Sequence, residues 1–278
     1  MIEVRSYVEI LNLVLESCKF NLSLDIRIVC LDVSEFFLYN SFFEEPIEEE
    51  SPEISELIHK INMLISKNGI RVCVFVGEKH FLASQLEESK NSTISVLNRF
   101  SEILDILGIN YPSIMIRIGS AYGNRKNTMD EFCKRLSLLE SSVIPKLCIM
   151  NDDKPSLFST TDLLSGIYYK VGIPICFRIL PHQFNDGGLT IREALFLACS
   201  TWESGKKPIF LYSESSEYDK NGIPVNVISK EHLTKRIPTF GLDLDVIIDS
   251  SAKEDSCLKY RMEYKSLPPI IINKIDKK

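Results

Sequence analysis

The stretch KLCIMNDDKPSLFSTTDLLSGIYYKVGIPICFRI, residues 146–179, contains one strand–helix–strand unit. It begins with the apolar run KLCIM and ends with the apolar run PICFRI, both of strand length. A polar loop, residues 151–154, follows the first run, and Gly172 with Pro174 marks the end of the helical part. Because two parallel strands need a crossover connection, which is usually a helix, this order predicts a parallel pair.

The same unit recurs along the chain. Seven apolar runs predict strands over residues 25–32, 70–76, 113–118, 146–150, 174–179, 208–212 and 244–249. Apolar residues at helical spacing predict helices over residues 54–68, 94–108, 128–140 and 190–202. Two of these helices open with a capping-box pattern, Thr128 with Glu131 and Thr190 with Glu193.

Strict alternation of strands and helices, with strands apolar on both faces, predicts a parallel sheet covered by helices. We expect a single TIM (β/α)8-type barrel over residues 1–278, which has a suitable length for that fold. The first strand is shortened or missing, with Ile2–Arg5 as its candidate, and residues 265–278 form a carboxyl-terminal tail. An open doubly wound sheet is the alternative, although the chain has no Gly-x-Gly-x-x-Gly turn.

Composition limits the functional classes. The formal net charge is −6 and the pI about 5.4, which argues against a generally basic surface for nucleic acid. The eight cysteines form no Cys-x-x-Cys pair, so we expect neither structural zinc nor a disulfide framework. No apolar run reaches membrane-spanning length, and Met1 is followed at once by charged residues. We therefore expect an intracellular, soluble protein.

Polar clusters follow the predicted strands. In a barrel of this kind the loops after the strands carry the function. Here these loops cover residues 77–81, 119–125, 151–154, 180–186, 213–218 and 250–255.

Several of these segments resemble the UV-damage endonuclease family in order and spacing. The resemblance rests on LGINYPSIMIRIGSAYGNR (107–125), LCIMNDDK (147–154), GIPICFRILPHQFN (172–185) and the pair TW at 201–202. It is best over residues 60–254. It implies a TIM barrel whose mouth holds divalent metals of the manganese, magnesium or zinc type, and which nicks DNA beside UV lesions.

The chain departs from that family at most of the implied ligand positions. Relative to the pattern that the resemblance implies, the replacements are Phe75, Arg117, Met150, Arg178, Pro181, Pro208 and Phe210, with Glu78 and Lys79 at the lesion-probing pair. Carboxylates and imidazoles are the ligands that such metals need. A divalent ion about 4 Å from one guanidinium would be repelled by roughly 8 kcal/mol at an effective dielectric constant near 20. We therefore expect no bound metal and no cofactor.

Three polar residues of the family motif remain, Asn151, Asp152 and Asp153. We expect them to hydrogen-bond the loop and to pair with Arg117 or Arg178, although a metal site is the alternative. The two arginines could instead bind a phosphate or another anion.

The remaining candidates lie in the loops after the strands. Tyr122, Glu78 and Lys79 are further binding candidates. His182 is either a structural histidine or a catalytic base. Trp202 is expected to be a packing residue.

These observations predict a non-catalytic barrel used for binding or scaffolding, with a protein partner or self-association. The acidic segment 42–56 disfavours DNA, whose binding relies on cationic side chains. The alternative is an active metal-dependent DNA repair endonuclease with a remodelled site. Its candidate residues are Asp152, Asp153, His182, Glu78 and Asp249. A third reading is an enzyme that grips a phosphorylated small molecule.

Overall fold

The structure, a computed structural model, describes residues 7–36, 51–77, 79–109 and 111–264. Contacts divide the chain into two compact units, and each is described by itself. The first unit comprises Met1–Met150 with Ser165–Pro174, and the second comprises Asn151–Leu164 with Ile175–Lys278.

The first unit contains four parallel strands that pair in chain order, each with the next. They are β1 (Ile28–Asp32), β2 (Arg71–Phe75), β3 (Ile114–Ile116) and β4 (Leu147–Met150). The helices of this unit are α1 (Tyr7–Ser23), α2 (Val33–Phe36), α3 (Pro52–Asn68), α4 (Glu87–Ile106), α5 (Arg125–Arg135) and α7 (Tyr169–Val171). The strands are therefore joined by helical crossovers, as parallel pairing requires.

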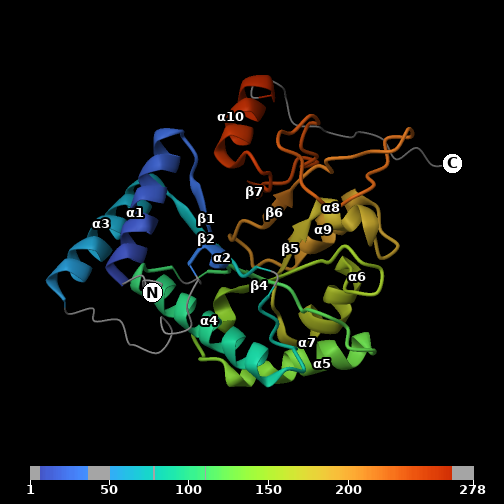
Figure 1. The fold of residues 1–278 in the computed structure, drawn as a ribbon, viewed down its shortest axis with the longest axis horizontal. Coiled ribbons are helices and arrows are strands. Elements are labelled where there is room, and N and C mark those ends of the chain that lie inside the picture. Colours follow the sequence, from blue (N-terminus) through green and yellow to red (C-terminus); the bar gives the residue numbers. More distant parts are fainter. Residues whose placement is uncertain (1–6, 37–50, 78, 110, 265–278) are drawn as a thin grey trace, which may run out of the picture. The chain divides into compact units, whose positions relative to one another are not determined.

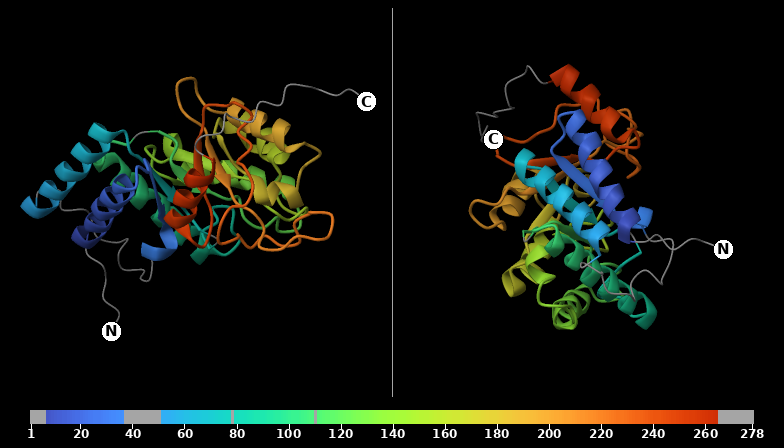
Figure 2. Two further views of the ribbon diagram at one scale, coloured as in Figure 1. Left: turned by 90° about the horizontal axis from the view of Figure 1, so that it is seen from above. Right: turned by 90° about the vertical axis from the view of Figure 1, so that its left-hand side faces the viewer.

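One face of these strands is wholly aliphatic. Its residues are buried and in register across the four strands: Val29, Leu31, Val72, Val74, Ile114, Ile116, Leu147 and Ile149. Helix α1 packs on β1 and on α3, while α4 packs on β3. Figures 1 and 2 show α1 and α3 lying side by side. Side chains along a strand alternate between its two faces, so the aliphatic face forms one part of the core of the first unit. Buried residues on the opposite face form another part: Cys73, Met115, Cys148 and Met150.

The second unit contains three parallel strands, again paired in chain order. They are β5 (Ile175–Arg178), β6 (Ile209–Tyr212) and β7 (Asp245–Ile248). Its helices are α6 (Thr160–Leu163), α8 (Ile179–Phe184), α9 (Ile191–Ser200) and α10 (Lys253–Tyr264). Trp202 is buried after α9, and its indole Nε1 donates a hydrogen bond to the Ile175 carbonyl at 2.8 Å. This contact confirms the packing role expected for the tryptophan.

The seven predicted strands are confirmed. Thr190 caps α9 as expected, because its Oγ1 accepts from the Glu193 amide and the Glu193 carboxylate accepts from the Thr190 amide. The capping box predicted at Thr128 is wrong. Helix α5 begins earlier, at an Asn124 cap, so Thr128 lies inside it and donates to the Ala121 carbonyl.

Other expectations fall partly outside the described residues. Gly172 ends α7 with a φ of 72°, as predicted for a helix-terminating glycine. The candidate first strand, Ile2–Arg5, the acidic residues 42–50 and the tail 265–278 lie outside the described residues. All eight cysteines are thiols. None of the helices in the described ranges is long and apolar enough to cross a membrane.

Candidate functional site

The strand ends of the first unit carry an unusual row of side chains opposite the aliphatic core. Register places Phe75 beside Met115 and Met115 beside Cys148. Met150 ends β4 two residues after Cys148, and Arg117 lies one residue past β3, two after Met115. Continued strand alternation places both side chains on this face. Three positions at which the family resemblance implies metal ligands, Phe75, Arg117 and Met150, therefore lie on one face of the sheet.

Arg117 is buried, with 9% of its surface exposed, and its guanidinium lies over an aromatic ring. The guanidinium carbon is 5.7 Å from the centre of the Phe81 ring, a cation–π distance. The same ring covers Gly119, where an added Cβ would lie 2.8 Å from Phe81. Gly119 also has a φ of 108°, which favours glycine. The Phe81 ring thus lies against the residues that follow β3, next to both the Arg117 guanidinium and Gly119.

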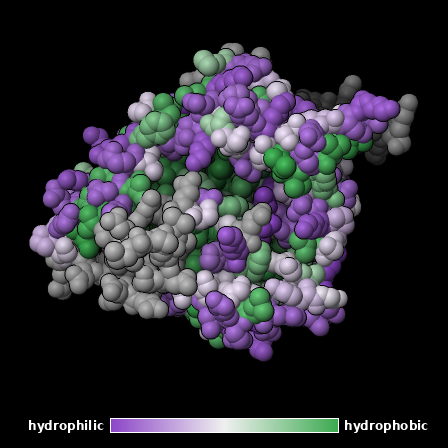
Figure 3. Space-filling model, in the orientation of Figure 1, coloured by the Kyte–Doolittle hydropathy of each residue, from purple (hydrophilic) through white to green (hydrophobic). Residues whose placement is uncertain are grey.

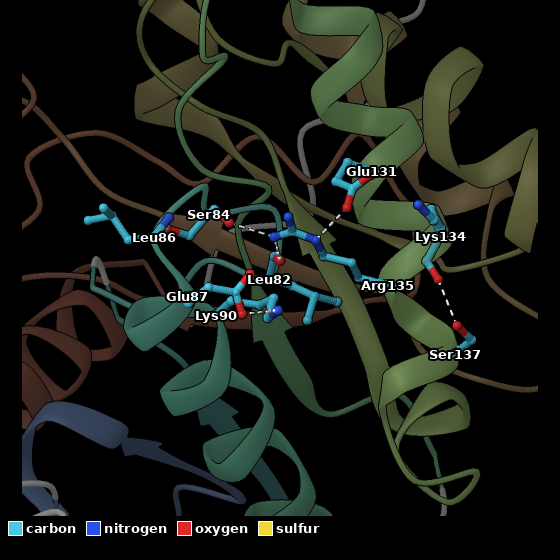
Figure 4. Close-up of polar contacts among 9 residues, drawn as sticks. All are labelled: Leu82, Ser84, Leu86, Glu87, Lys90, Glu131, Lys134, Arg135 and Ser137. Carbon is cyan, nitrogen blue, oxygen red and sulfur yellow. Dashed lines mark hydrogen bonds and ion pairs between the residues drawn. The ribbon is translucent and has the colours of Figure 1, made fainter.

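The loop after β2 is anchored by Arg135 of α5 (Figure 4). Arg135 Nη1 donates to the carbonyls of Leu82 at 2.9 Å and Ser84 at 2.5 Å. Its Nε pairs with Glu131 at 2.7 Å. Because both carbonyls belong to the segment that follows Phe81, a single guanidinium fixes the loop that carries this ring.

The sequence candidates in these first-unit loops differ in their placement. Lys79 is exposed, Tyr122 is half-buried with a φ of 42°, and Glu78 lies outside the described residues. Asp32, which the sequence reasoning missed, ends β1 in register with Phe75. Its Oδ1 accepts hydrogen bonds from the Ser34 amide at 2.8 Å and the Ser34 hydroxyl at 2.7 Å. The signal that could have found Asp32 is its place as the last residue of a predicted strand.

In the second unit, Asn151 serves as a backbone clamp. Its Oδ1 accepts from the Arg178 amide at 2.7 Å, and its Nδ2 donates to the Arg178 carbonyl at 3.0 Å. The Asn151 side chain is completely buried, whereas Arg178 is half-buried. Both polar ends of the side chain are therefore used in fixing the end of β5, as expected for a residue that shapes the loop.

The acidic residues after Asn151 lie in a loop that is held through its backbone. The Asp152 amide donates to the Phe158 carbonyl at 2.9 Å. Asn185 Nδ2 donates to the carbonyls of Asp152 at 3.2 Å and Lys154 at 2.9 Å. Asp152 is buried with 1% of its surface exposed, and Asp153 is half-buried. These backbone bonds hold the loop. The predicted bonds of the Asp152 and Asp153 side chains to loop amides stay predictions, as do their ion pairs with the arginines.

His182 lies in α8 and is buried, with 1% of its surface exposed. Its ring contacts the Phe177 ring edge to face, with centres 5.1 Å apart. Burial lowers the pKa of His182, against a smaller opposing effect of a hydrogen bond to the Leu189 backbone. Nδ1 has no hydrogen-bond partner among the residues that the structure describes. The imidazole is therefore neutral near pH 7, and its Nδ1 is buried without a described partner.

Register in the second unit corrects one implication of the family resemblance. Phe177 pairs with Phe210, and Arg178 pairs with Leu211. The rings of Phe177 and Phe210 stack at 5.8 Å, on the face opposite to that of Arg178. Arg178 and Phe210 therefore cannot both face the same site, so at least one of these two assigned ligand positions is wrong. A shift of one residue, to Leu211, restores a common face.

Two further carboxylates lie after strands β6 and β7. Asp249 follows β7, is half-exposed, and its amide donates to the Tyr212 carbonyl at 2.9 Å. Glu214, which the sequence reasoning passed over, is buried and accepts from the amides of Thr234 at 2.8 Å and Lys235 at 2.7 Å. Burial and then the nearby Glu214 raise the pKa of Tyr212 far above its usual range. Glu214 therefore fixes a long loop to the end of β6.

The donor chemistry of these residues was compared with the metals that the family resemblance implies. Phe75 provides no ligand atom, Met150 provides only a soft thioether, and Arg117 carries a positive charge. These three side chains do not fit a divalent metal of the manganese, magnesium or zinc type. Within the described ranges, no three His, Cys, Asp or Glu side chains are grouped closely enough to hold a metal ion.

Comparison with known proteins identifies the relatives of this chain. The sequence model of the family described as "UV-endonuclease UvdE" matches residues 6–275. A UV DNA damage endonuclease from Clostridium perfringens (strain 13 / Type A) is 29% identical over 61% of this chain and 42% of its own length. One from Bacillus cereus (strain 03BB102) is 26% identical over 76% of this chain and 67% of its own length. The match thus spans less than half of the Clostridium relative.

The fold is similar to that of a solved structure. The crystal structure of SacUVDE superimposes with a TM-score of 0.77 and 26% sequence identity, covering 92% of this chain and 86% of that chain. The predicted fold class, a TIM (β/α)8-type barrel, is confirmed by this similarity. The chain belongs to the UV-endonuclease UvdE family.

Proposed function

We propose that this UvdE-family protein is a non-catalytic barrel that uses its strand-end surface for binding or scaffolding. The observation that supports this best is the row formed by Phe75, Arg117 and Met150 on one face of the first unit. Hydrolysis of a phosphodiester by such a family needs metals that activate water and stabilise charge on the phosphate. An aromatic ring, a guanidinium and a thioether supply none of the ligands for that chemistry.

The positions of the polar residues support the same proposal. Asn151 uses both ends of its amide on the Arg178 backbone, and the backbone around Asp152 is held by Asn185. Arg117 is stacked on Phe81 in a loop that Arg135 anchors. These contacts stabilise the loops after the strands and would do so without any metal chemistry.

For the partner, we propose a protein surface, either of another protein or of a second copy of this chain. The loop between β6 and β7 exposes four β-branched residues: Ile223, Val225, Val227 and Ile228, each between 44% and 68% exposed. Figure 3 shows hydrophobic residues scattered among hydrophilic ones on the face of the molecule that it draws. Clustered apolar exposure is typical of protein contacts rather than of DNA contacts, which rely on cations. A Val225→Glu variant should reduce self-association measured by light scattering, or capture of a partner.

An incision assay tests the non-catalytic assignment. UV-irradiated duplex DNA is incubated with the purified protein and manganese, and nicks are counted beside those made by a UV DNA damage endonuclease from one of the relatives. We expect no nicking above the protein-free background. Metal-dependent nicking that is lost in an Asp152→Ala variant would overturn the proposal.

A variant that gains metal binding tests whether these three side chains are what prevents it. The triple variant Phe75→His, Arg117→His, Met150→Glu places two imidazoles and a carboxylate on one face of the sheet. We expect this variant to bind manganese more tightly than the wild type, measured by calorimetry. The matched control, Phe75→Leu, Arg117→Leu, Met150→Leu, places side chains without ligand atoms at the same three positions and should gain no such binding.

The second candidate is an active metal-dependent DNA repair endonuclease with a remodelled site from Asp152, Asp153, His182 and Asp249. It is favoured by one observation, the buried His182 with an Nδ1 that has no partner within the described residues. A neutral imidazole of this kind suits a metal ligand or a base. The incision assay above separates the two functions, and a His182→Gln variant would lose activity under this second assignment.

A further inference from the structure

Two cysteines lie next to each other on adjacent strands of the first unit. Cys30 of β1 and Cys73 of β2 are register partners in a parallel pair. Register partners on neighbouring strands point to the same face, and strands lie about 4.8 Å apart. Disulfides join Cα atoms that are about 4.4–6.8 Å apart, so this pair meets the first geometric requirement for a bond.

The two thiols differ in their exposure to solvent. Cys30 is exposed, whereas Cys73 is completely buried. Redox-sensing cysteines are solvent-accessible and often lie next to a second, resolving cysteine, which fits Cys30 beside Cys73. The other partly accessible thiols, Cys133, Cys199 and Cys257, are less suited, because burial raises the pKa of each, to about 11 for Cys199.

We propose that Cys30 and Cys73 form a reversible oxidation site, in which a peroxide converts the two thiols into an intramolecular disulfide. The Cys30 thiolate attacks one peroxide oxygen, the O–O bond breaks, and a sulfenic acid forms on Cys30 with release of water or an alcohol. Cys73 Sγ then attacks the Cys30 sulfur, the S–O bond breaks, and a second water leaves with the Cys73 proton. Two electrons pass from the two thiols to the peroxide.

The spacing of the two strands makes this disulfide strained. Directly opposed side chains on parallel strands start about as far apart as the strands themselves, roughly 4.8 Å. The Cβ atoms of a relaxed disulfide are about 3.5–4.5 Å apart. The strands must therefore approach by several tenths of an ångström, and a strained disulfide is more easily reduced. The site is suited to transient oxidation rather than to permanent cross-linking.

Peptide mapping of the wild-type protein tests the site directly. Trypsin places Cys30 in the peptide of residues 28–60 and Cys73 in the peptide of residues 72–79, with no other cysteine in either. The reduced protein is treated with a small excess of hydrogen peroxide, alkylated and digested without reductant. We expect the two peptides joined, with a mass lower by two hydrogens than their sum, and separated by dithiothreitol.

Matched variants sharpen the result. Cys257→Ser should leave the joined peptides unchanged, while Cys30→Ser should abolish them. Cys73→Ala should let a sulfenic acid accumulate on Cys30, where dimedone traps it. If this variant does not fold, the peptide map of the wild-type protein tests the proposal by itself. Peroxide treatment that oxidises Cys30 to higher acids, joins two chains through Cys30, or leaves both peptides separate would overturn the proposal.

Discussion

Replacement of Asn151 by alanine should destabilise the second unit strongly. The variant removes two hydrogen bonds to the Arg178 backbone, at 2.7 and 3.0 Å, from a side chain that is completely buried. Each bond contributes roughly 1 kcal/mol, and a buried backbone group left without a partner costs about 1–3 kcal/mol. We expect the free energy of unfolding to fall by about 2–4 kcal/mol.

Urea unfolding followed by tryptophan fluorescence measures this loss, because Trp202 donates to Ile175 at the other end of the same strand. At a slope of about 2–3 kcal/mol per molar urea, the midpoint should fall by roughly 1 M. Asn221→Ala, at an exposed position, is the matched control and should stay within about 0.5 kcal/mol of the wild type. A similarly small loss for Asn151→Ala would refute the assignment of Asn151 as a structural clamp.

Three further predictions follow from contacts within single units. Lys146→Ala should reduce the free energy of unfolding by about 2–3 kcal/mol, because Lys146 is 2% exposed and its ammonium bonds Asp105, Ser101 and Ser142. Lys60→Ala, which breaks a solvent-exposed pair with Glu56, should change the free energy of unfolding far less, and equal losses in urea titrations would contradict this. Gly187→Ala should lower the melting temperature more than Gly222→Ala does. Both glycines have a positive φ, but only at Gly187 would an added Cβ lie 2.4 Å from Ser159 Oγ. Equal shifts of the melting temperature in calorimetry would refute this steric argument. Burial lowers the pKa of His182 in the folded protein, so the unfolded chain binds a proton first as the pH falls below about 6.5, and the free energy of unfolding should decrease from about pH 7 to about pH 5. Urea unfolding at each pH should show a weaker pH dependence for His182→Gln, and an unchanged pH dependence would contradict this prediction.

The strands were predictable because β–α alternation and apolar runs are local properties of the chain. All seven strands lie where the runs predicted them, and the Thr190 cap has the expected bonds. The Thr128 cap failed because Asn124, four residues earlier, competes for the same helix start and accepts from the Asn127 amide. A pattern of spacing alone cannot rank two competing caps.

The candidate site was less predictable than the fold. That Asn151 shapes its loop was expected, but its partner, the Arg178 backbone, lies 27 residues away and depends on tertiary structure. The face of each strand residue also needs the register, which shows Arg178 beside Leu211 and not beside Phe210. The roles of Phe81, Arg135 and Glu214 were missed for the same reason, since their contacts are set by loop conformation.

The central claim, that the strand-end face does not hold divalent metals, is tested most directly by elemental analysis. The protein is saturated with manganese and dialysed against metal-free buffer, and its metal content is measured beside that of the triple variant Phe75→His, Arg117→His, Met150→Glu. We predict less than about 0.1 mole of manganese, zinc or magnesium per mole of wild-type protein, because its ligand atoms are missing. Retention of about two or more metal ions per chain would contradict the account.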